Sequence, residues 1–405
     1  MTLDNSTVGA GEVSARSWDV IIVGGGVIGS AIAHFLAAEP AFLGSVLVVE
    51  RDPSYARSST ALSAGSIRQQ FSTQENIRIS QFGFDFLKAI DEHLAVGGEA
   101  PDISLVEAGY LFLATDQGIG ILRENHVVQR GCGAEVSLLS PDTLRDRFAW
   151  LKADDLAGGS LGLAGEGWFD AFALLQAFQR SARALGAVYV DDEVIGLARA
   201  GDRITGVILR ERGSVACGTC VNAAGPSAAA LSAMAGIELP VGPRKRVVFY
   251  FQCPEPIASA PLVVDPSGLY FRPEGEGFIC GMAPPPEDDA DSADFDVDYA
   301  MFEHRIWPRL ADRVPAFETL RLLRAWAGHY AYNTFDQNAV LGPHPDVSNF
   351  LFANGFSGHG LQQAPAVGRG IAERIIFGAY RTLDLERLSY GRILAGKPLR
   401  EFAVV

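Results

Sequence analysis

A glycine-rich turn near the N-terminus constrains the fold of this chain more than any other feature. The stretch WDVIIVGGGVIGSAIAHFLAA predicts a β-branched strand at 20–23, the motif Gly24-x-Gly26-x-x-Gly29, and a helix with apolar residues every three or four positions. Only a bare backbone lets a pyrophosphate approach the N-terminus of such a helix, where free N–H groups and the helix dipole favour negative charge. The turn therefore predicts a dinucleotide-binding α/β unit, with an ordinary glycine turn as the alternative.

An acidic residue at the expected spacing strengthens this interpretation. A second strand is predicted at 46–49, and it ends at Glu50, about 20 residues beyond Gly29. An acid at this distance accepts hydrogen bonds from the ribose of a dinucleotide. A GxGxxG motif alone is weak evidence, but the flanking strand, the helix and the terminal acid make the prediction specific.

Composition argues against several other classes of protein. The chain has 405 residues, of which 48% are hydrophobic and 20% charged, as expected for a globular protein of two or three structural units. Its formal net charge is −15 and no basic stripe is visible, which disfavours nucleic acid as a partner. The uncharged stretch 20–38 is long enough to cross a bilayer. Its four glycines favour a strand, a turn and a buried helix instead, so we expect no transmembrane segment.

The cysteines and the first residues of the chain predict a cytoplasmic location. Five cysteines without a regular framework indicate a reducing compartment. Cys217 and Cys220 form a CxxC pair in a predicted strand, where residues i and i+3 point to opposite faces, so we predict no metal site. The N-terminus has neither the basic nor the apolar region of a signal peptide.

The segment after Glu50, RDPSYARSSTALSAGSIRQQF, offers small hydroxyl residues that can donate to a phosphate or a flavin ring. Here the sequence resembles the D-amino-acid-oxidase-like flavoenzymes, in the branch of sarcosine oxidase, dimethylglycine dehydrogenase and glycine oxidase. Within that branch LSAGSIRQQFS looks most like the FAD-dependent oxidoreductase domain proteins linked to assembly of respiratory complex I. The resemblance extends from Trp18 to about Arg381 and implies FAD, noncovalently or covalently bound, rather than NAD; we predict noncovalent binding.

Two later segments resemble further flavin-binding parts of this family. VNAAGPSA predicts a strand that ends in small residues, so that backbone packs against the dinucleotide; ordinary small-residue packing is the alternative. NFLFANG, the turn FSGHG and a helix over 361–377 resemble the C-terminal flavin segment. The N-terminus of that helix would stabilise negative charge at the flavin pyrimidine edge. The two glycine-rich turns are therefore predicted to converge on one flavin.

The motifs and the resemblance assign FAD contacts to residues spread along the whole chain. In the related sarcosine oxidases a cysteine bonded to the flavin stands at the position of His329, so a covalent bond from His329 stays open as the alternative. The predicted FAD-binding residues are Gly24, Gly26, Val27, Ile28, Gly29, Glu50, Arg51, Ser58, Ser59, Thr60, Ala64, Gly65, Val194, Ala224, Gly225, Gly328, His329, Gly355, Gly358, His359, Gly360, Leu361 and Gln362.

Four side chains are candidates for the chemistry: Arg272, Tyr330, His359 and Arg68. A carboxylate substrate needs a cation, for which Arg272 is the candidate, while Arg68 is expected near the flavin. A structural salt bridge is the alternative for both. His359 is predicted to contact the flavin or the substrate, or else to be a satisfied turn histidine. The clamps of the relatives are absent, because Tyr330 and Gln362 stand where glycine oxidase and sarcosine oxidase carry an arginine and a lysine.

The predicted fold class is α/β, a Rossmann-like FAD-binding domain of the glutathione-reductase-2 type interleaved with a substrate domain on an antiparallel sheet. The acid-rich segment PPPEDDADSADFDVD has no apolar periodicity and predicts a solvated loop. The expected boundaries are 17–96, 151–235 and 325–390 for the FAD-binding domain, 97–150 and 236–324 for the substrate or cap domain, and 1–16 for a flexible N-terminus.

The resemblance implies an FAD-dependent oxidoreductase that oxidises the C–N bond of a secondary or N-alkyl amino acid by hydride transfer to flavin N5. Sarcosine, glycine and dimethylglycine represent this substrate class. Ile279 stands where sarcosine-type oxidases carry an oxygen-activating lysine, which favours a dehydrogenase with another electron acceptor. The alternative is an FAD-containing assembly or accessory protein of a respiratory complex with little amine activity. The oligomeric state is left open.

Overall fold

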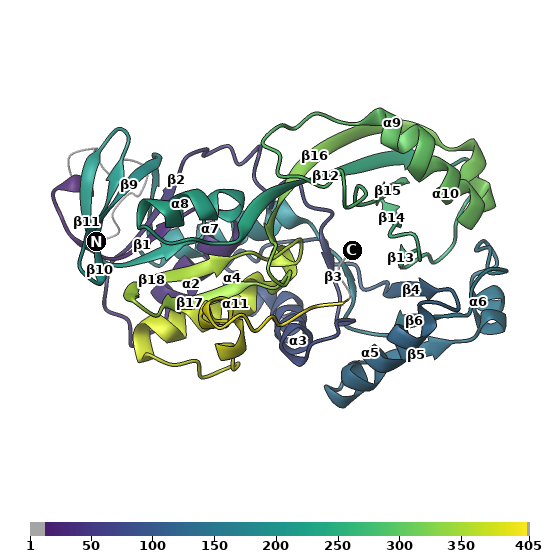
Figure 1. The fold of residues 1–405 in the computed structure, drawn as a ribbon, viewed down its shortest axis with the longest axis horizontal. Coiled ribbons are helices and arrows are strands. Elements are labelled where there is room, and N and C mark those ends of the chain that lie inside the picture. The colour runs from purple at the N-terminus through teal and green to yellow at the C-terminus, as the bar shows by residue number, and fades with distance from the viewer. Residues whose placement is uncertain (1–12, 403–405) are drawn as a thin grey trace.

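The computed structural model describes residues 13–402 of the chain. The flexible N-terminus predicted for 1–16 therefore lies mostly outside the described residues. Of that stretch, Val13 is buried, and its carbonyl oxygen accepts a hydrogen bond from the indole N–H of Trp18 at 3.2 Å. Two large sheets organise the chain and lie side by side in Figure 1.

The first sheet is a mixed, mainly parallel one. Its central strand alternates between two hydrophobic cores: Val20 and Ile22 face one, and Ile21 and Val23 face the other. A strand that is apolar throughout fits a sheet covered on both faces. The strand order is β17 (Val340–His344), β18 (Val347–Asn354), β11 (Gly213–Asn222), β1 (Trp18–Val23), β2 (Val46–Glu50) and β8 (Val188–Asp191), with β10 (Arg203–Leu209) and then β9 (Val194–Ala200) paired from β11.

Parallel pairing brings the ends of several strands of this sheet to one edge. β1 runs parallel to β2 and to β11, and β11 runs parallel to β18. Gly24 therefore follows its strand at the same edge where Gly355 follows β18 and where Glu50 ends β2. In an open α/β sheet, this carboxyl edge is where ligands bind.

The second sheet was predicted to be antiparallel, and it is mixed, because β13 pairs with β4 in parallel. The other described pairs in it are antiparallel. Its order is β16 (Arg321–Asn333), β12 (Val241–Gln252), β15 (Gly277–Gly281), β14 (Tyr270–Glu274), β13 (Leu262–Val264), β4 (Tyr110–Ala114), β6 (Gly158–Gly162) and β5 (Val136–Leu139). The short strands β3 (Ser66–Ile67) and β7 (Gly167–Trp168) form a separate pair between the two large sheets.

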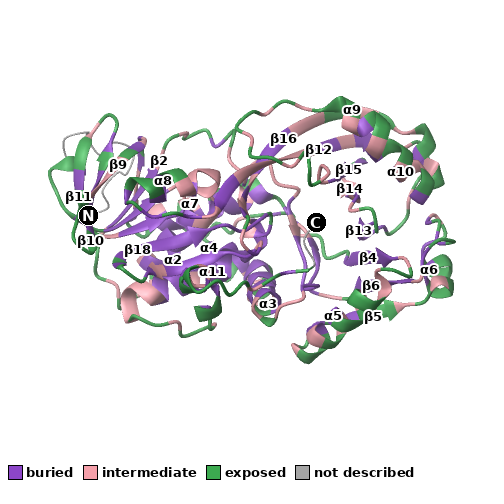
Figure 2. Cartoon of the chain, viewed as in Figure 1, coloured by how far each residue is buried: buried purple, intermediate pink, exposed green. Residues whose placement is uncertain are grey.

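The helices that position the site are α2 and α11, which begin at the two glycine-rich turns. They pack closely, because a Cβ at Gly368 would lie only 2.7 Å from the Cβ of Ala31. Figure 2 shows both helices mostly buried beside the first sheet. The helices are α2 (Val27–Ala38), α3 (Gln74–Lys88), α4 (Ile90–Leu94), α5 (Ile119–Gly131), α6 (Pro141–Arg147), α7 (Ala171–Ala184), α8 (Ala228–Met234), α9 (Tyr299–Met301), α10 (Trp307–Arg313), α11 (Gly360–Phe377) and α12 (Gly391–Leu394), with 3-10 turns η1 (Gly225–Ser227), η3 (Pro315–Thr319) and η4 (Glu386–Leu388) and a π-helical turn η2 (Phe302–Ile306).

The acid-rich segment 284–298 is an irregular and largely exposed loop, as its composition predicts, and it is also held by ion pairs. Its carboxylates pair with the basic residues of β12, and the best-formed pair joins Arg246 to both oxygens of Asp289 at 2.6 and 2.9 Å. Lys245 pairs with Asp294 at 2.5 Å. The segment is therefore attached to the long β12–β16 ribbon, which spans the two halves of the molecule in Figure 1.

Sheet membership gives a partial view of the predicted domain boundaries. β6 and most of β16 fall within ranges that were assigned to the FAD-binding domain, yet both strands pair in the second sheet. The boundaries themselves stay a prediction.

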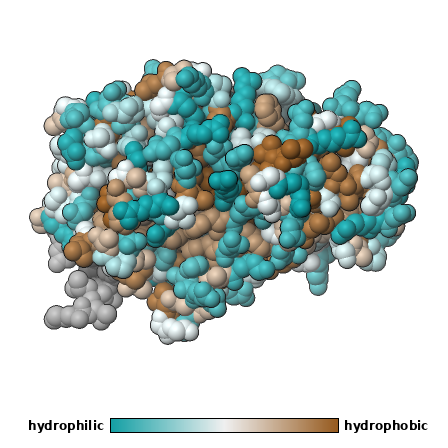
Figure 3. Space-filling view, turned by 90° about the horizontal axis from the view of Figure 1, so that it is seen from below, coloured by the Kyte–Doolittle hydropathy of each residue, from teal (hydrophilic) through white to brown (hydrophobic). Residues whose placement is uncertain are grey.

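None of the helices described for 13–402 is long and apolar enough to cross a membrane. On the face seen in Figure 3, polar residues lie between the apolar ones.

Candidate active site

The glycines of the first turn have distinct physical roles. Gly24 has φ +103°, and a Cβ there would lie 2.3 Å from the carbonyl oxygen of Ala223. A Cβ at Gly29 would lie 1.9 Å from the carbonyl oxygen of Gly24, so α2 can start this close to β1 only with glycine. At Gly26 a Cβ would meet nothing nearer than Thr60 Oγ1 at 3.6 Å. The backbone at Gly26 is thus the open point of the turn.

Two side chains from later segments hold the first turn. The Gly25 N–H donates to Oε2 of Glu50 at 2.8 Å, and the Asp52 N–H donates to Oε1 of the same carboxylate at 2.9 Å. The Val27 N–H donates to Oγ1 of Thr60 at 3.2 Å. The acid that the motif predicted for a ribose therefore also fixes the turn, and each of its oxygens keeps a second lone pair for a ligand.

The second turn is as tightly specified as the first. Gly355, Ser357 and Gly358 have φ of +75°, +49° and +99°, all in the left-handed region. A Cβ at Gly358 would lie 2.5 Å from the ring of Tyr330, so this ring packs directly on the turn. α11 follows with His359 at its N-cap, and no side chain caps it. The N–H groups of the first helical turn are the part of α11 suited to negative charge.

Arg68 and His359 join the segment after β2 to the second turn. Arg68 Nη2 lies 3.2 Å from Nε2 of His359, and the Arg68 backbone N–H donates to Oε1 of Gln362 at 2.9 Å. Burial lowers the pKa of His359 well below its ordinary value, and the charge of Arg68 lowers it further. An arginine can only donate, so a neutral His359 accepts at Nε2 and carries its proton on Nδ1.

Aromatic side chains wall in the Arg68 guanidinium, which is 2% exposed. Its carbon lies 4.0 Å from the ring centre of Phe71. The rings of Phe112 and Tyr110, both on β4, follow at 5.2 and 5.9 Å. Such rings attract a cation through their π faces and keep water away from it. Sequence reasoning missed Tyr110 and Phe112 because a strand pattern does not tell which face meets a distant arginine.

Three tyrosines, each on a different strand of the second sheet, lie near one another, and two of them are close to this guanidinium. Burial raises the pKa of Tyr110, of Tyr330 and, most strongly, of Tyr270. All three hydroxyls are therefore neutral near pH 7, and the charge of Arg68 acts on two of them, Tyr110 and Tyr330. The predicted residue Tyr330 thus lies with Arg68 and His359 in one cluster.

Glu166 is a second residue that the sequence prediction missed. It is fully buried, and its carboxylate accepts hydrogen bonds from the N–H groups of Gln69 at 2.6 Å and Gln70 at 3.0 Å and from Nε2 of Gln70 at 2.8 Å. Burial raises its pKa to about 7 against these bonds. The Gln70 carbonyl in turn accepts from Arg68 Nη1, so Glu166 holds the turn that carries Arg68. An acid between glycines in GLAGEGW was the available signal.

Arg272 is tied to protein groups. Its Nε donates to the carbonyl oxygen of Ala64 at 3.1 Å, and its Nη1 donates to the carbonyl oxygen of Pro273 at 2.7 Å and pairs with Glu274. These contacts favour the structural alternative for Arg272. The guanidinium thereby fixes the segment next to Gly65, which has φ +68° and no room for a Cβ beside Phe169.

His329 lies on β16 under the acid-rich segment. Its ring centre is 4.4 Å from that of Phe295, and burial lowers its pKa. Its carbonyl oxygen accepts from Oγ of Ser59 at 2.6 Å. Its Nε2 is buried and makes no hydrogen bond to the described residues. An orphaned nitrogen of this kind is suited to a bound group.

The structure gathers the predicted FAD residues into two connected groups. The Val27–Thr60 and Arg68–Gln362 bonds described above link them. The side chain of Arg51 is exposed rather than turned into the site. Val194 begins β9, where it pairs with Leu209 of β10. One group lies at the carboxyl edge of the first sheet and comprises Gly24, Gly26, Val27, Ile28, Gly29, Glu50, Arg51, Ala224, Gly225, Gly355, Gly358, His359, Gly360, Leu361 and Gln362. The other comprises Ser58, Ser59, Thr60, Ala64, Gly65, Gly328 and His329, on the segment after β2 and on β16.

A family model described as FAD dependent oxidoreductase, DAO, matches residues 19–374. The chain belongs to the DAO family of FAD-dependent oxidoreductases. This membership confirms the predicted resemblance, the predicted fold class and FAD as the cofactor. Among the DAO-family relatives, FAD-dependent oxidoreductase domain-containing protein 1 of Xenopus laevis is 45% identical, over 98% of this chain and 86% of its own length.

Solved structures of the DAO fold match the chain almost from end to end. L-proline dehydrogenase from P. horikoshii is 28% identical with a TM-score of 0.84, over 95% of this chain and 99% of that one. Glycine oxidase from Geobacillus kaustophilus is 25% identical with a TM-score of 0.78, over 92% and 98%. No cluster of three or more His, Cys, Asp or Glu suited to a metal ion occurs within 13–402.

Proposed function

We propose that this DAO-family oxidoreductase oxidises the C–N bond of a secondary or N-alkyl amino acid. The observation that carries the proposal is the buried Arg68–His359 contact, walled by aromatic rings, at the N-terminus of α11. A fixed cation beside an apolar wall suits a substrate with a carboxylate and an alkyl-substituted amine. The similarity to L-proline dehydrogenase supports the same class, since proline is a secondary amino acid.

The residues at the carboxyl edge of the first sheet fit FAD. The open backbone at Gly26 suits the diphosphate, as does the N-terminus of α2, where the N-cap residue is a glycine without a side chain and the Val27 N–H donates to Thr60. Glu50 suits the ribose, and the N-terminus of α11 suits the pyrimidine edge of the ring system. When bound, FAD supplies the acceptor position, N5, for the hydride that leaves the carbon next to the amine nitrogen as the C=N bond forms.

The side chains of the cluster bind and orient the substrate in this proposal. Arg68 is the cation that we propose for the substrate carboxylate, because it lies beside His359 at the N-terminus of α11. The neutral His359 keeps Arg68 in place by accepting at Nε2. The amine must lose its proton before oxidation, and a wall that excludes water favours the uncharged form. Tyr330, packed on Gly358, positions the turn beside the reacting carbon.

The electron acceptor that we propose is not oxygen. Ile279, at the position where sarcosine-type oxidases carry an oxygen-activating lysine, is 1% exposed on β15 and offers no charge. We also propose noncovalent FAD and keep the cytoplasmic location as a prediction. The assembly role remains the alternative, and no contact within 13–402 favours it over catalysis.

An anaerobic screen of the FAD-loaded protein tests the proposal. L-Proline, sarcosine and dimethylglycine are added in turn, and the flavin absorbance band is followed. We expect bleaching by at least one of them, with slow recovery in oxygen and fast recovery with a quinone or dye. Arg68→Lys should raise KM for a carboxylate substrate about tenfold or more, because a point charge replaces a planar donor pair. No bleaching by any amine, together with a stably co-purifying partner, would support assembly; rapid peroxide formation would contradict a dehydrogenase.

A further inference from the structure

The C-terminal segment 385–402 lies beyond the part of the chain that matches the family model, which ends at residue 374. In Figure 1 the yellow coil after α12 passes α11 and runs toward α3. This segment is attached at two places, one at a buried aspartate after β16 and one at the N-terminus of α3. The first attachment leads directly to the second glycine-rich turn.

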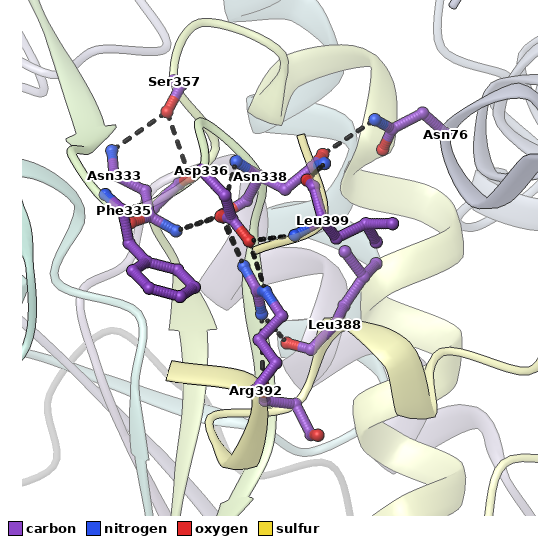
Figure 4. A network of polar contacts seen from close by, with 11 residues as sticks. Asn76, Asn333, Phe335, Asp336, Asn338, Ser357, Leu388, Arg392 and Leu399 are labelled. Atoms are coloured by element: carbon purple, nitrogen blue, oxygen red, sulfur yellow. Dashed lines mark hydrogen bonds and ion pairs between the residues drawn. The ribbon is translucent and has the colours of Figure 1, made fainter. Parts of the chain in front are cut away.

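Asp336 is the centre of the first attachment, shown in Figure 4. Its Oδ2 accepts from Nε of Arg392 at 2.7 Å and from the Leu399 N–H at 2.9 Å, and its Oδ1 accepts from Nη2 of Arg392 at 2.9 Å. The Asp336 side chain is 0% exposed and that of Arg392 6%. The Asn338 side chain donates to the carbonyl oxygen of Leu399 at 2.6 Å. Arg392 is therefore fixed inside the protein, and the backbone of the partly buried Leu399 is held at both its N–H and its carbonyl group.

Asn333 carries this attachment to the second turn. Its Nδ2 donates to Oδ1 of Asp336 at 2.9 Å, and its backbone N–H donates to Oγ of Ser357 at 3.0 Å. Ser357 has φ +49°, which a residue other than glycine adopts only when its surroundings hold it there. The Ser357 N–H also donates to the carbonyl oxygen of Ala331 at 3.0 Å. The strained residue of the turn is thus held by a chain of bonds that starts at Arg392.

Glu401 makes the second attachment. Its carboxylate accepts from the N–H groups of Ser72 at 2.7 Å and Thr73 at 3.3 Å and from Nδ2 of Asn76 at 3.0 Å. Thr73 is the N-cap of α3 but makes no capping bond with its own side chain. Glu401 therefore fixes the two residues that precede α3, and the Asn76 side chain connects it to Gln363 of α11, whose Nε2 donates to Oδ1 of Asn76 at 3.1 Å.

We propose that segment 385–402 is a strap that positions the second glycine-rich turn through Asp336 and thereby sets how tightly the chain retains FAD. Asp336 and Arg392 are positioning residues in this view. The proposal rests on the placement of FAD given under the proposed function, but it does not depend on which amine is oxidised. It assigns a role to residues outside the family model.

Graded variants of Arg392 test the strap. Arg392→Met leaves the buried Asp336 without its ion-pair partner, while Arg392→Lys keeps the charge and loses the two-pronged contact. We expect the FAD dissociation constant to rise about tenfold or more in Arg392→Met and by less in Arg392→Lys. Amide exchange in the apoprotein should accelerate at 353–361 and stay unchanged at 22–30. The control is Glu386→Gln, which breaks the half-exposed Arg374 pair on the same segment and should leave both readouts unchanged.

Glu401→Gln provides a second, milder variant that keeps the chain length and the shape of the side chain. It should accelerate exchange at the start of α3 and weaken FAD retention less than Arg392→Met. Unchanged FAD affinity in Arg392→Met, or acceleration spread evenly over both glycine-rich turns, would overturn the proposal. If no amine bleaches the flavin, the proposed function fails while these readouts still decide the strap.

Discussion

Several single residues in this protein affect the candidate site indirectly, by fixing the backbone or the side chains of other residues. Glu166 does not touch a predicted FAD residue, yet it accepts from the backbone of Gln69 and Gln70 and so fixes the turn after Arg68. Because the carboxylate is fully buried in this position, its pKa is raised. Some glycines matter because they have no side chain. A Cβ at Gly29 would collide with the carbonyl oxygen of Gly24, whereas a Cβ at Gly120 would meet nothing within 4 Å.

Glu166→Gln should change how stability depends on pH. The folded pKa, about 7, lies above the ordinary value of 4.5, so the folded state holds a proton between these values that the unfolded state has lost. The stabilising contribution of Glu166 is full below pH 4.5 and is lost as pH rises to about 7. The free energy of unfolding of the variant minus that of the wild type should therefore rise by roughly 3 kcal/mol from pH 4.5 to pH 8.

Urea unfolding of the apoprotein across this pH range gives the difference. The charged Arg68 and the neutral His359 are present in both proteins, so their own contributions cancel in the subtraction. Two parallel stability curves would show that Glu166 titrates normally and would remove it from the cluster.

Gly29→Ala should abolish FAD binding and destabilise the apoprotein by about 2 kcal/mol or more, because backbone must shift to admit the methyl group. Gly120→Ala, in an open position of α5, is the matched control and should be neutral or stabilising by up to about 1 kcal/mol. Flavin fluorescence and thermal unfolding measure both effects. Normal FAD affinity in Gly29→Ala would show that the first turn does not approach the diphosphate.

At the scale of elements, ion pairs attach the acid-rich segment to the second sheet. Segment 284–298 is a largely exposed loop, as its composition predicts. In addition, Asp289 and Asp294 pair with basic residues of β12, and Phe295 contacts His329. Partly buried pairs with two contacts resist screening better than exposed single contacts. The segment is therefore attached to the second sheet by ion pairs, and Val297 also packs against the hydrophobic core there.

A double-mutant cycle on Arg246 and Asp289 tests this attachment. Their side chains are 13% and 17% exposed, and they make two contacts, so we expect a coupling energy of roughly 1–2 kcal/mol that falls in high salt. The exposed pair Lys88–Glu107 is the control, with an expected coupling below about 0.5 kcal/mol. Equal coupling in the two pairs would contradict an attached segment.

At the scale of the whole molecule, two turns more than 300 residues apart lie at one edge of one sheet. Parallel pairing of β1, β11 and β18 brings them there, and the close packing of α2 on α11 keeps them there. A ligand that contacts both turns links the N-terminal and C-terminal parts of the chain. Its binding free energy then adds to the stability of the entire fold.

Adding FAD to the apoprotein should protect both turns from amide exchange together, at 24–30 and at 355–361. Since only the folded state binds FAD, the free energy of unfolding should rise by about 2.7 kcal/mol at a free FAD concentration of one hundred times the dissociation constant. Mass-resolved hydrogen exchange and urea unfolding measure the two effects. Protection of one turn alone would contradict a single site formed by both.

Local pattern was sufficient for much of this protein. Residues close to one another in sequence predict the strand, turn and helix around Gly24–Gly29, the position of Glu50 and the helix after His359. This is possible because backbone geometry and helical period are local properties. The family resemblance added FAD and the second turn. Those expectations correspond to β1, α2, β2, β18 and α11 in the structure.

Contacts between distant residues were decided only by the tertiary structure. Arg272 and Arg68 look alike in sequence, but the fold points one at the Ala64 carbonyl and the other at His359. Glu166 is buried, and Arg392 contacts Asp336, which lies 56 residues away in sequence. The hydrophobic periodicity of the sequence predicts neither of these features. A side chain's charge and hydrogen-bonding capacity are fixed by its type, whereas its partners and the dielectric around it depend on which segments the sheets bring together.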